Sequence, residues 1–543
     1  MPPPVDPVCP TSSPNRLPML SFRVFDGDRP AEDWPLRNAY LVGADGNAIR
    51  AEINQGNGLI KAEKREAGVC AFALQHQVGD LGELTIQTCL LPERDSPYIL
   101  NLELARHRLM LIYNKLEDWS MFDLAEDHPV TRRQTIARDL FIEALCLQHD
   151  NPPQAAKIAQ QALIAAVDGT EELALAHAEL LLNRRKATNS LPSAPIGCGV
   201  TIEHNDQRLK GGLQSHFDFV QLPCPWRVIA PEENQCQWQR MDDWAQWAAR
   251  HRLPVVAGPV VSFEPSCLPD WLYIWEHDYD TVRDLIYEHV ERVVSRYKTV
   301  VTMWNVVSGL HVNNHFTFNF EQLMDLTRMC TMLVKKIQPQ AKVMVEIRQP
   351  FGEYYAHNPK SIPPLMYGDL IVQSAIAFDA FGLRLPMGQA VQGQFTRDLM
   401  QVSSLMDQFS HFARPLYLTV SSPSEPVTSM MIARSDSDEP VDAVSGFWRR
   451  PWSESVQSRW LEAVFQIAIS KPYIDGIAWQ DLIDYPNIEL PLSGLLDEEI
   501  RLKESFRRIV AFRKNLRKIE SHAQVGINRP GSSDSAGAGG IEI

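Results

Sequence analysis

Residues 299–347, TVVTMWNVVSGLHVNNHFTFNFEQLMDLTRMCTMLVKKIQPQAKVMVEI, decide the fold of the larger part of this chain. The first and last runs, TVVTMWNVV and AKVMVEI, are short, apolar and rich in valine, which is typical of buried strands. Between them, EQLMDLTRMCTMLVKKI carries apolar residues at the spacing of an amphipathic helix. A strand, a helix and a second strand in this order predict a parallel βαβ unit.

The same alternation continues on both sides of this stretch. Strand-like runs such as FDFVQL, LPVVAGPVVSF, PLYLTVS and GIAWQD are separated by helical patterns such as TVRDLIYEHVERVVSRYK and SRWLEAVFQIAIS. Repeated units of this kind predict an α/β fold, and a closed (β/α)8 TIM barrel over residues 191–518 fits them best.

The residues before the barrel have two other patterns. Short strand-like runs separated by turn formers continue from Leu20 to about Asn114 and predict a β-sandwich-like module over residues 18–126. Residues 127–190 then show helical periodicity, with breaks at HDNPP and VDGT that predict a segment of three helices. The Pro/Ser-rich residues 1–17 and the Gly/Ser-rich residues 519–543 are predicted to be disordered.

Composition narrows the classes of partner. The 543 residues include 52 Lys+Arg and 67 Asp+Glu, a net charge of −15, which disfavours nucleic acid and anionic membranes as partners. No apolar run is long enough for membrane insertion. The first residues lack the features of a signal peptide, which favours a cytoplasmic location.

Cofactor and metal motifs are also missing from the sequence. The nine cysteines are scattered and form no CxxC pair, so a zinc site is not expected. The phosphate-binding, dinucleotide-binding and HExxH patterns do not occur either. We therefore expect no cofactor and no metal.

Several motifs in the barrel region resemble a known family. TVVTMWNVVSG is similar to a strand with the pattern WDVVNE, LYLTVSS to one with ITELD, and YIDGIAWQDLID to a late strand with a G-x-x-W-G segment. In this order and spacing they resemble the xylanase-type barrel of family 10 glycoside hydrolases, from Gly197 to about Leu516. The resemblance implies a barrel whose site lies at the carboxyl ends of its strands.

The same resemblance places Gly309 at the acid/base position and Val420 at the nucleophile position. A retaining glycosidase needs a carboxyl group at each, and neither residue can supply one. We therefore expect a catalytically degenerate barrel, not an active enzyme. If the chain is active, the resemblance implies an O-glycosyl hydrolase of the endo-xylanase kind that uses relocated carboxylates.

Three carboxylates near predicted strand ends are the fallback catalytic candidates: Glu264, Glu346 and Asp481. We favour the alternative that they are structural, with Arg348, Arg384 and Arg227 as possible ion-pair partners, because such pairs are common at strand ends.

Ligand binding without cleavage would use aromatic and polar groups at the barrel mouth. Trp479 matches the family's sugar-site tryptophan. The full set of candidate ligand-binding residues is Trp479, Trp271, Arg384, Asn305, Trp448 and Trp452. The expected partner is an oligosaccharide or polysaccharide. A protein partner bound through the N-terminal modules, with the barrel as a structural scaffold, is the remaining hypothesis.

Overall fold

The computed structural model describes residues 18–427 and 446–527, apart from Asn234, Asn314, Thr317 and Asn487, and for residues 518–527 it describes the backbone only. The prediction of disorder for residues 1–17 lies outside this part of the chain. The same prediction for residues 519–543 is wrong at its beginning, because the last helix continues to Ile527.

Eight parallel strands close into a barrel, as the sequence predicts. The first strand pairs with both the second and the last, which closes the ring. The third strand is continued beyond the Gly258–Pro259 bond by a two-residue strand, β14 (Val261–Ser262). The barrel strands are β11 (Ile196–Gly199), β12 (Phe219–Leu222), β13 (Val255–Ala257), β15 (Met303–Ser308), β16 (Lys342–Ile347), β17 (Ala380–Pro386), β18 (Leu416–Ser421) and β20 (Ile474–Trp479).

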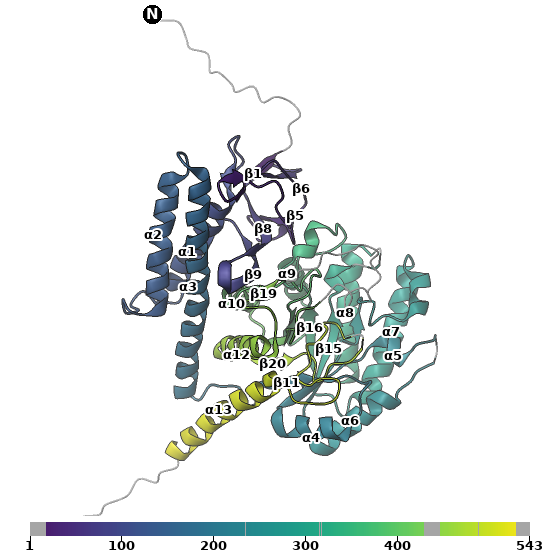
Figure 1. Cartoon of the computed structure of the whole chain (residues 1–543). Helices are drawn as coiled ribbons and strands as arrows, with labels where there is room; N and C mark the ends of the chain where they lie inside the picture. Colours follow the sequence, from purple (N-terminus) through teal and green to yellow (C-terminus); the bar gives the residue numbers. More distant parts are fainter. Residues whose placement is uncertain are drawn as a thin grey trace, which may run out of the picture.

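Helices follow the strands and cover the outside of the barrel (Figure 1). In α8 an Asn319–Gln322 capping box holds the first turn, and leucines at helical spacing are buried against the barrel. The helices are α4 (Gln207–His216), α5 (Trp226–Ile229), α6 (Gln239–His251), α7 (Tyr279–Tyr297), α8 (Phe320–Ile337), α9 (Pro364–Gln373), α10 (Leu399–Ser410), α12 (Glu454–Ser470) and α13 (Glu504–Ile527), with short 3-10 helices η2 (Asp270–Trp275), η3 (Leu310–Val312) and η4 (Glu353–Ala356).

Two small sheets form the first module. Phe22 of one sheet stacks on Phe72 of the other with ring centroids 5.1 Å apart, so the two sheets share a core. The first sheet has the order β10 (Tyr98–Ile99), β1 (Met19–Arg23), β7 (Leu59–Lys64) and β6 (Ala51–Gly56). The second has the order β19 (Phe447–Trp448), β9 (Gly82–Gln87), β8 (Cys70–Gln77), β4 (Tyr40–Gly43) and β5 (Ala48–Ile49). The short elements β2 (Phe25–Asp26), β3 (Arg29–Pro30) and η1 (Gly79–Leu81) complete the module.

The helical part differs from the prediction in two places. The strand-like pattern expected up to Asn114 ends earlier, because α1 (Leu100–Asp118) buries apolar residues at intervals of four on one face. The three helices expected between 127 and 190 are two, α2 (Pro129–Leu147) and α3 (Pro152–Ala187). The predicted break at VDGT is wrong because α3 runs straight through it.

Packing explains why a glycine sits inside α3. A β-carbon at Gly169 would lie 3.1 Å from the Arg133 β-carbon on α2, so a side chain there would push the two helices apart. The neighbouring Asp168 and Thr170 are buried as well. The VDGT segment is therefore a close helix contact and not a turn.

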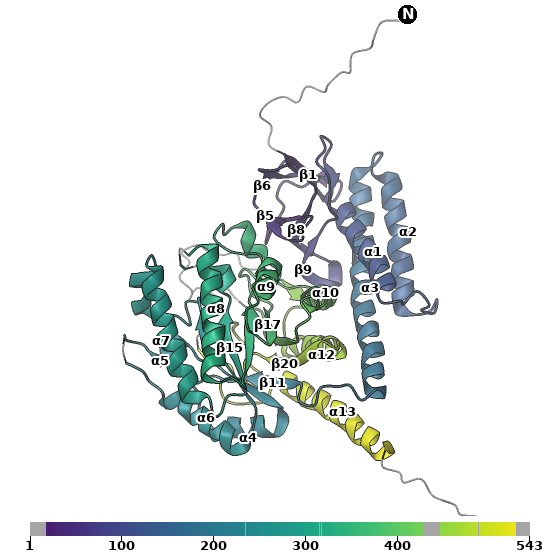
Figure 2. The same cartoon turned by 180° about the vertical axis from the view of Figure 1, so that it is seen from behind.

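The first module and the barrel are joined by backbone pairing and buried charges. Strand β19 leaves the barrel between β18 and α12 and pairs antiparallel with β9 of the first module. Helix α3 lies along α10 and α12 (Figure 2). At this contact Arg108 of α1 forms a buried ion pair of 2.5 Å with Asp398, the residue that caps α10. The first module is thus attached to one side of the barrel.

Candidate functional site

The carboxyl ends of the barrel strands and the loops after them form the mouth of the barrel, where the sequence places the site. Gly309 directly follows β15 and has a φ of +67°. A β-carbon built on it would lie 2.7 Å from Cδ of Arg348, so the arginine side chain fills the space that a residue at 309 would use. Val420 lies in β18, fully buried, in register with Leu385 and Trp479 of the neighbouring strands.

An ion network crosses the mouth between three loops. Arg348 follows β16 and Arg384 lies in β17, and each places a guanidinium nitrogen 2.5 Å from a different oxygen of Glu489. Glu489 belongs to the loop after β20. Glu264, after β14, contacts Arg348 Nε at 3.1 Å. The Gln480 amide donates to Glu489 as well, at 3.1 Å.

These contacts determine the charge state of Glu489. Burial by itself raises the pKa of the Glu489 carboxyl, but Arg348 and Arg384 outweigh it and lower the pKa to about 2. Glu489 is therefore ionised at every physiological pH. A carboxylate held by two arginines is a poor general acid and a poor nucleophile.

The two other fallback candidates have different surroundings. Glu346 is buried and accepts a 2.5 Å hydrogen bond from the Ser308 hydroxyl. Burial raises the pKa of Asp481 to about 7, against the opposing effect of Arg384. Asp481 accepts a long hydrogen bond of 3.4 Å from Ser493. The protonated form of Asp481 is thus favoured to a higher pH than that of an ordinary aspartate.

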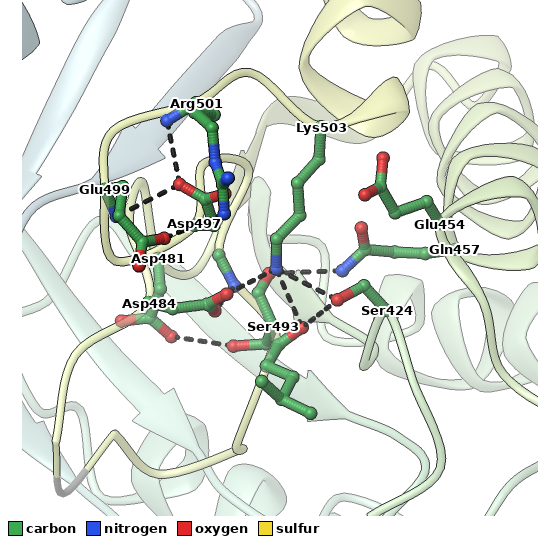
Figure 3. Close-up of polar contacts among 12 residues, drawn as sticks. Ser424, Glu454, Gln457, Asp481, Asp484, Ser493, Asp497, Glu499, Arg501 and Lys503 are labelled. Atoms are coloured by element: carbon green, nitrogen blue, oxygen red, sulfur yellow. Dashed lines mark hydrogen bonds and ion pairs between the residues drawn. The ribbon is translucent and has the colours of Figure 1, made fainter.

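A buried lysine, Lys503, forms an ion pair with Asp484, which lies three residues after Asp481 in the same loop (Figure 3). Lys503 Nζ is 2.5 Å from Asp484 and donates to the Ser424 hydroxyl at 2.9 Å. The other Asp484 oxygen accepts from the Gly494 amide at 2.7 Å. These bonds connect the loop after β20 to the loop after β18, so they hold the loop that carries Glu489 in place.

The ion-pair interpretation is confirmed for Glu264, whose partner is Arg348. The other two arginines have partners that the sequence did not indicate: Arg384 binds Glu489, and Arg227 binds Asp270 at 2.9 Å. Sequence reasoning missed Glu489 and Lys503. Glu489 lies 141 residues from Arg348 along the chain, and no local pattern marks such a pair.

Three of the candidate aromatic residues have no ring face open to a ligand in this structure. Trp479 is fully buried, and its indole donates to the Ser493 carbonyl at 2.8 Å. Trp452 is buried and donates to the Gly446 carbonyl at 3.1 Å. Trp448 is buried between the barrel and the first module, where it donates to Glu171 at 2.7 Å. These side chains position loops and join modules.

The remaining candidates lie in separate places. Arg384 lies at the mouth, whereas Asn305 is buried within β15, three residues before its end, and its Oδ1 has no hydrogen-bond partner among the described residues. Trp271 lies away from this network, half-buried in η2 beside Trp226 of α5. The candidate residues therefore do not form one aromatic cleft.

Among the described residues, no group of three His, Cys, Asp or Glu side chains is placed to hold a metal ion. None of the described helices combines the length and the apolar character needed to cross a lipid bilayer. The structure does not test the prediction that nucleic acid is not a partner, nor the prediction that a protein partner binds the N-terminal modules. Both stay predictions.

Comparison with known proteins agrees with the architecture. Residues 196–324, from β11 into α8, match the family described as Glycosyl hydrolase family 10. This first part of the barrel is thus similar in sequence to that family. The match includes β15 and Gly309, which follows it, and does not reach Val420.

Two similar proteins are endo-1,4-beta-xylanases. Endo-1,4-beta-xylanase 2 of Aureobasidium pullulans is 28% identical over 117 residues, which are 21% of this chain and 32% of that protein. Endo-1,4-beta-xylanase A of Xylanibacter ruminicola is 26% identical over 91 residues, 16% of this chain and 24% of that one. The chain thus spans about a third or less of the length of these relatives. Native xylanase 10B from Thermotoga maritima has 16% identity and a TM-score of 0.44, over 62% of this chain and 99% of that one.

Proposed function

We propose that this protein is a xylanase-type barrel that binds a carbohydrate at its mouth and does not cleave it. The observation that carries the proposal is the relation between Gly309 and Arg348. The position that the resemblance assigns to the acid/base carboxyl is a glycine, and the aliphatic part of Arg348 fills the adjoining space. Restoring the carboxyl would require Arg348 to move.

The remaining carboxylates support the same conclusion. A retaining glycosidase needs two carboxyl groups about 5–5.5 Å apart, one of them protonated. Glu264 and Glu489 are both ion-paired to Arg348. Glu346 is bound by Ser308. Each of these three carboxylates is therefore already bound by a neighbouring side chain of the barrel.

Polar groups at the mouth fit the hydroxyl groups of a sugar. Arg384 and Glu489 keep side-chain exposures of 17% and 22%, so a ligand can reach them from solvent. Gln221 of β12 is half-buried and donates to Thr419 at 2.8 Å, which leaves its amide oxygen as a further acceptor. Such hydrogen-bonding groups fix the orientation of a ligand.

The test combines an activity assay with a binding assay. Because the similar proteins are endo-1,4-beta-xylanases, xylan and an aryl xyloside serve as substrates and xylohexaose as the ligand for calorimetry. We expect no hydrolysis, and binding that falls at least tenfold in Arg384→Ala. Arg138→Ala is the matched control, because Arg138 forms an exposed ion pair with Asp139 on α2, outside the barrel. Hydrolysis by the unaltered protein, or the absence of xylohexaose binding, would contradict the proposal.

Hydrolysis with relocated carboxylates is a second candidate, favoured by one observation. Asp481, with a pKa of about 7, has the proton affinity of a general acid. If any hydrolysis is observed, Asp481→Asn and Glu264→Gln test this candidate directly. If both variants lose that activity and keep the circular dichroism spectrum of the unaltered protein, Asp481 and Glu264 are the catalytic pair. The protein is then a hydrolase and not a binding protein.

A further inference from the structure

Three consecutive residues between β17 and α10 are bound by the part of the chain that precedes the barrel. The Thr396 carbonyl accepts a hydrogen bond of 2.9 Å from the Thr85 amide of β9. Arg397 donates to the Tyr40 hydroxyl of β4 at 3.1 Å. The next residue, Asp398, forms a buried ion pair with α1. The segment that follows β17 is therefore attached to two strands of the first module and to the helix after them.

Arg397 also connects this segment to the neighbouring loop, which follows β16. It forms an ion pair with Glu353 of η4, and its guanidinium lies 4.0 Å from the centre of the Phe351 ring. The other Glu353 oxygen accepts from the Gly393 amide at 2.6 Å. Tyr40, Arg397 and Glu353 are all buried. A buried charge needs its partners in fixed places, so these contacts hold the two loops against each other.

The loop after β16 begins with the mouth residue Arg348. The next residue, Gln349, has a φ of +46°, a left-handed conformation that is costly for a residue with a side chain. A β-carbon built on Gly393 would overlap Cγ of Gln349, so the loop after β17 lies directly on the Gln349 side chain. Strained backbone persists where its surroundings hold it in place. The loop that Arg397 and Glu353 fix is thus the one that packs on the strained residue beside Arg348.

These contacts form a continuous series from the first module to the mouth. The series starts at Tyr40 and passes through Arg397 to Glu353. The loop that contains Glu353 starts at Arg348, and the strand before the other loop contains Arg384. Loops at the mouth of a barrel are mobile unless other elements hold them. Loops that are fixed before a ligand arrives reduce the entropy that binding costs.

We propose that Arg397 and Glu353 are positioning residues for the ligand at the mouth, and that the first module takes part in binding through them. They do not touch the ligand, and they act by fixing the loops beside Arg348 and Arg384. The inference rests on the proposed binding of a carbohydrate at the mouth. It gives the first module a function in binding that its packing against the barrel does not by itself require.

Tyr40→Phe tests the proposal with the smallest change, because it removes one acceptor of Arg397 and keeps the ring that packs in the junction. Tyr355→Phe is the matched control, since Tyr355 is half-buried and packs in the same cluster. We expect calorimetry to show binding of xylohexaose about fivefold weaker in Tyr40→Phe, the effect of losing one buried hydrogen bond. Tyr355→Phe should bind as the unaltered protein does.

A second variant separates positioning from a general loss of stability. Glu353→Gln removes the charge that pairs with Arg397, and the double variant Tyr40→Phe/Glu353→Gln combines both changes. If the two residues act through Arg397, the double variant binds xylohexaose no more weakly than Glu353→Gln alone. Independent effects on stability would multiply the two losses of affinity. A multiplied loss would therefore contradict the proposal.

Hydrogen–deuterium exchange reports on the same loops without a ligand. In Tyr40→Phe the amides of residues 349–353 and 388–397 should exchange faster, while those of residues 480–486, after β20, keep their rates. If the unaltered protein binds xylohexaose and Tyr40→Phe binds it equally well, the positioning role is wrong and the proposed function stands.

If the unaltered protein does not bind xylohexaose, the proposed function fails and the exchange rates decide the positioning role. Faster exchange confined to the two loops would support this role for whatever ligand the mouth takes. Equal exchange in Tyr40→Phe and the unaltered protein would overturn it.

Discussion

Arg348 lies against Gly309, with its Cδ 2.7 Å from the place where a β-carbon of residue 309 would be. Arg348 is also the residue that bridges Glu264 and Glu489. The glycine at 309 and the ion network across the mouth are therefore linked through the side chain of Arg348. Changing either residue alone disturbs the other.

Gly309→Glu should fail to create hydrolytic activity and should destabilise the protein. The new side chain meets Arg348, and a non-glycine residue at a φ of +67° adds backbone strain of roughly 1–3 kcal/mol. Thermal unfolding of Gly309→Glu and Gly309→Ala separates the two causes, because alanine brings mainly the backbone strain. An active Gly309→Glu variant would show that Arg348 moves aside easily.

Glu489→Gln should lower the free energy of unfolding at neutral pH by an amount on the order of 3 kcal/mol, because it leaves two largely buried arginines with a neutral partner. The folded-state pKa of Glu489 is lowered to about 2. Its contribution to the free energy of unfolding is therefore present at pH values above the pKa of an ordinary glutamate and is lost as the pH falls toward 2. Urea unfolding at pH 7, 5 and 3 should show the difference shrinking with acidity. A difference that is constant with pH would contradict this assignment.

Asp481→Asn should have the opposite pH dependence. The pKa of Asp481 is raised to about 7, so the folded state favours the protonated form. The contribution of the Asp481 carboxyl to the free energy of unfolding is therefore full below the ordinary aspartate pKa and is lost as the pH rises through 7. The variant should therefore gain stability relative to the unaltered protein as the pH rises from about 4 to 7, at about 1.4 kcal/mol for each unit of pKa shift. Glu499→Gln, an exposed change in the same loop, should show no such gain.

Glu171→Ala should weaken the junction between the two modules. Glu171 is fully buried in α3 and accepts hydrogen bonds from Trp448 at 2.7 Å and from the Leu399 amide at 3.1 Å. Its ion pair with Arg449 measures 2.7 Å. Arg449 keeps its second partner, Asp168, at 3.0 Å, so we expect a loss of about 1–3 kcal/mol, typical of leaving the buried Trp448 indole and Leu399 amide without their acceptor.

Calorimetry tests this prediction by the shape of the transition. The unaltered protein should unfold in one cooperative step, and the Glu171→Ala variant should show two separated steps or one at a much lower temperature. Glu179→Ala, an exposed change on the same helix, is the control. An unchanged transition in Glu171→Ala would contradict the role of this contact.

The barrel could be predicted from the sequence because each of its units is local. Valine-rich runs and helical periodicity recur within a few tens of residues, so the pattern survives without knowledge of tertiary contacts. The error at VDGT has the opposite origin. In the sequence Gly169 is typical of a turn. In the structure its small size lets α3 pack closely against Arg133 of α2, and a contact between two helices cannot be inferred from the local sequence.

The candidate site was harder to predict, for the same reason. Sequence order gave the positions of Gly309 and Val420 in the strands, and it suggested Arg348 as an ion-pair partner. It did not reveal Glu489, which reaches the mouth from a loop far along the chain. The sequence also indicated Trp479 as a ligand-binding residue. In the structure its ring is fully buried, and residue type alone does not tell whether a ring face is covered.

Strand β19 has a consequence for how this chain is made. The sheet that contains β9 begins near residue 40, but its outer strand, Phe447–Trp448, is synthesised some 360 residues after β9 itself. During synthesis β9 therefore presents an unpaired edge for most of the time that the ribosome spends on this protein, at ordinary elongation rates on the order of tens of seconds. An unpaired edge is a template for pairing with other chains. That edge is therefore open to such pairing until the barrel supplies its own strand.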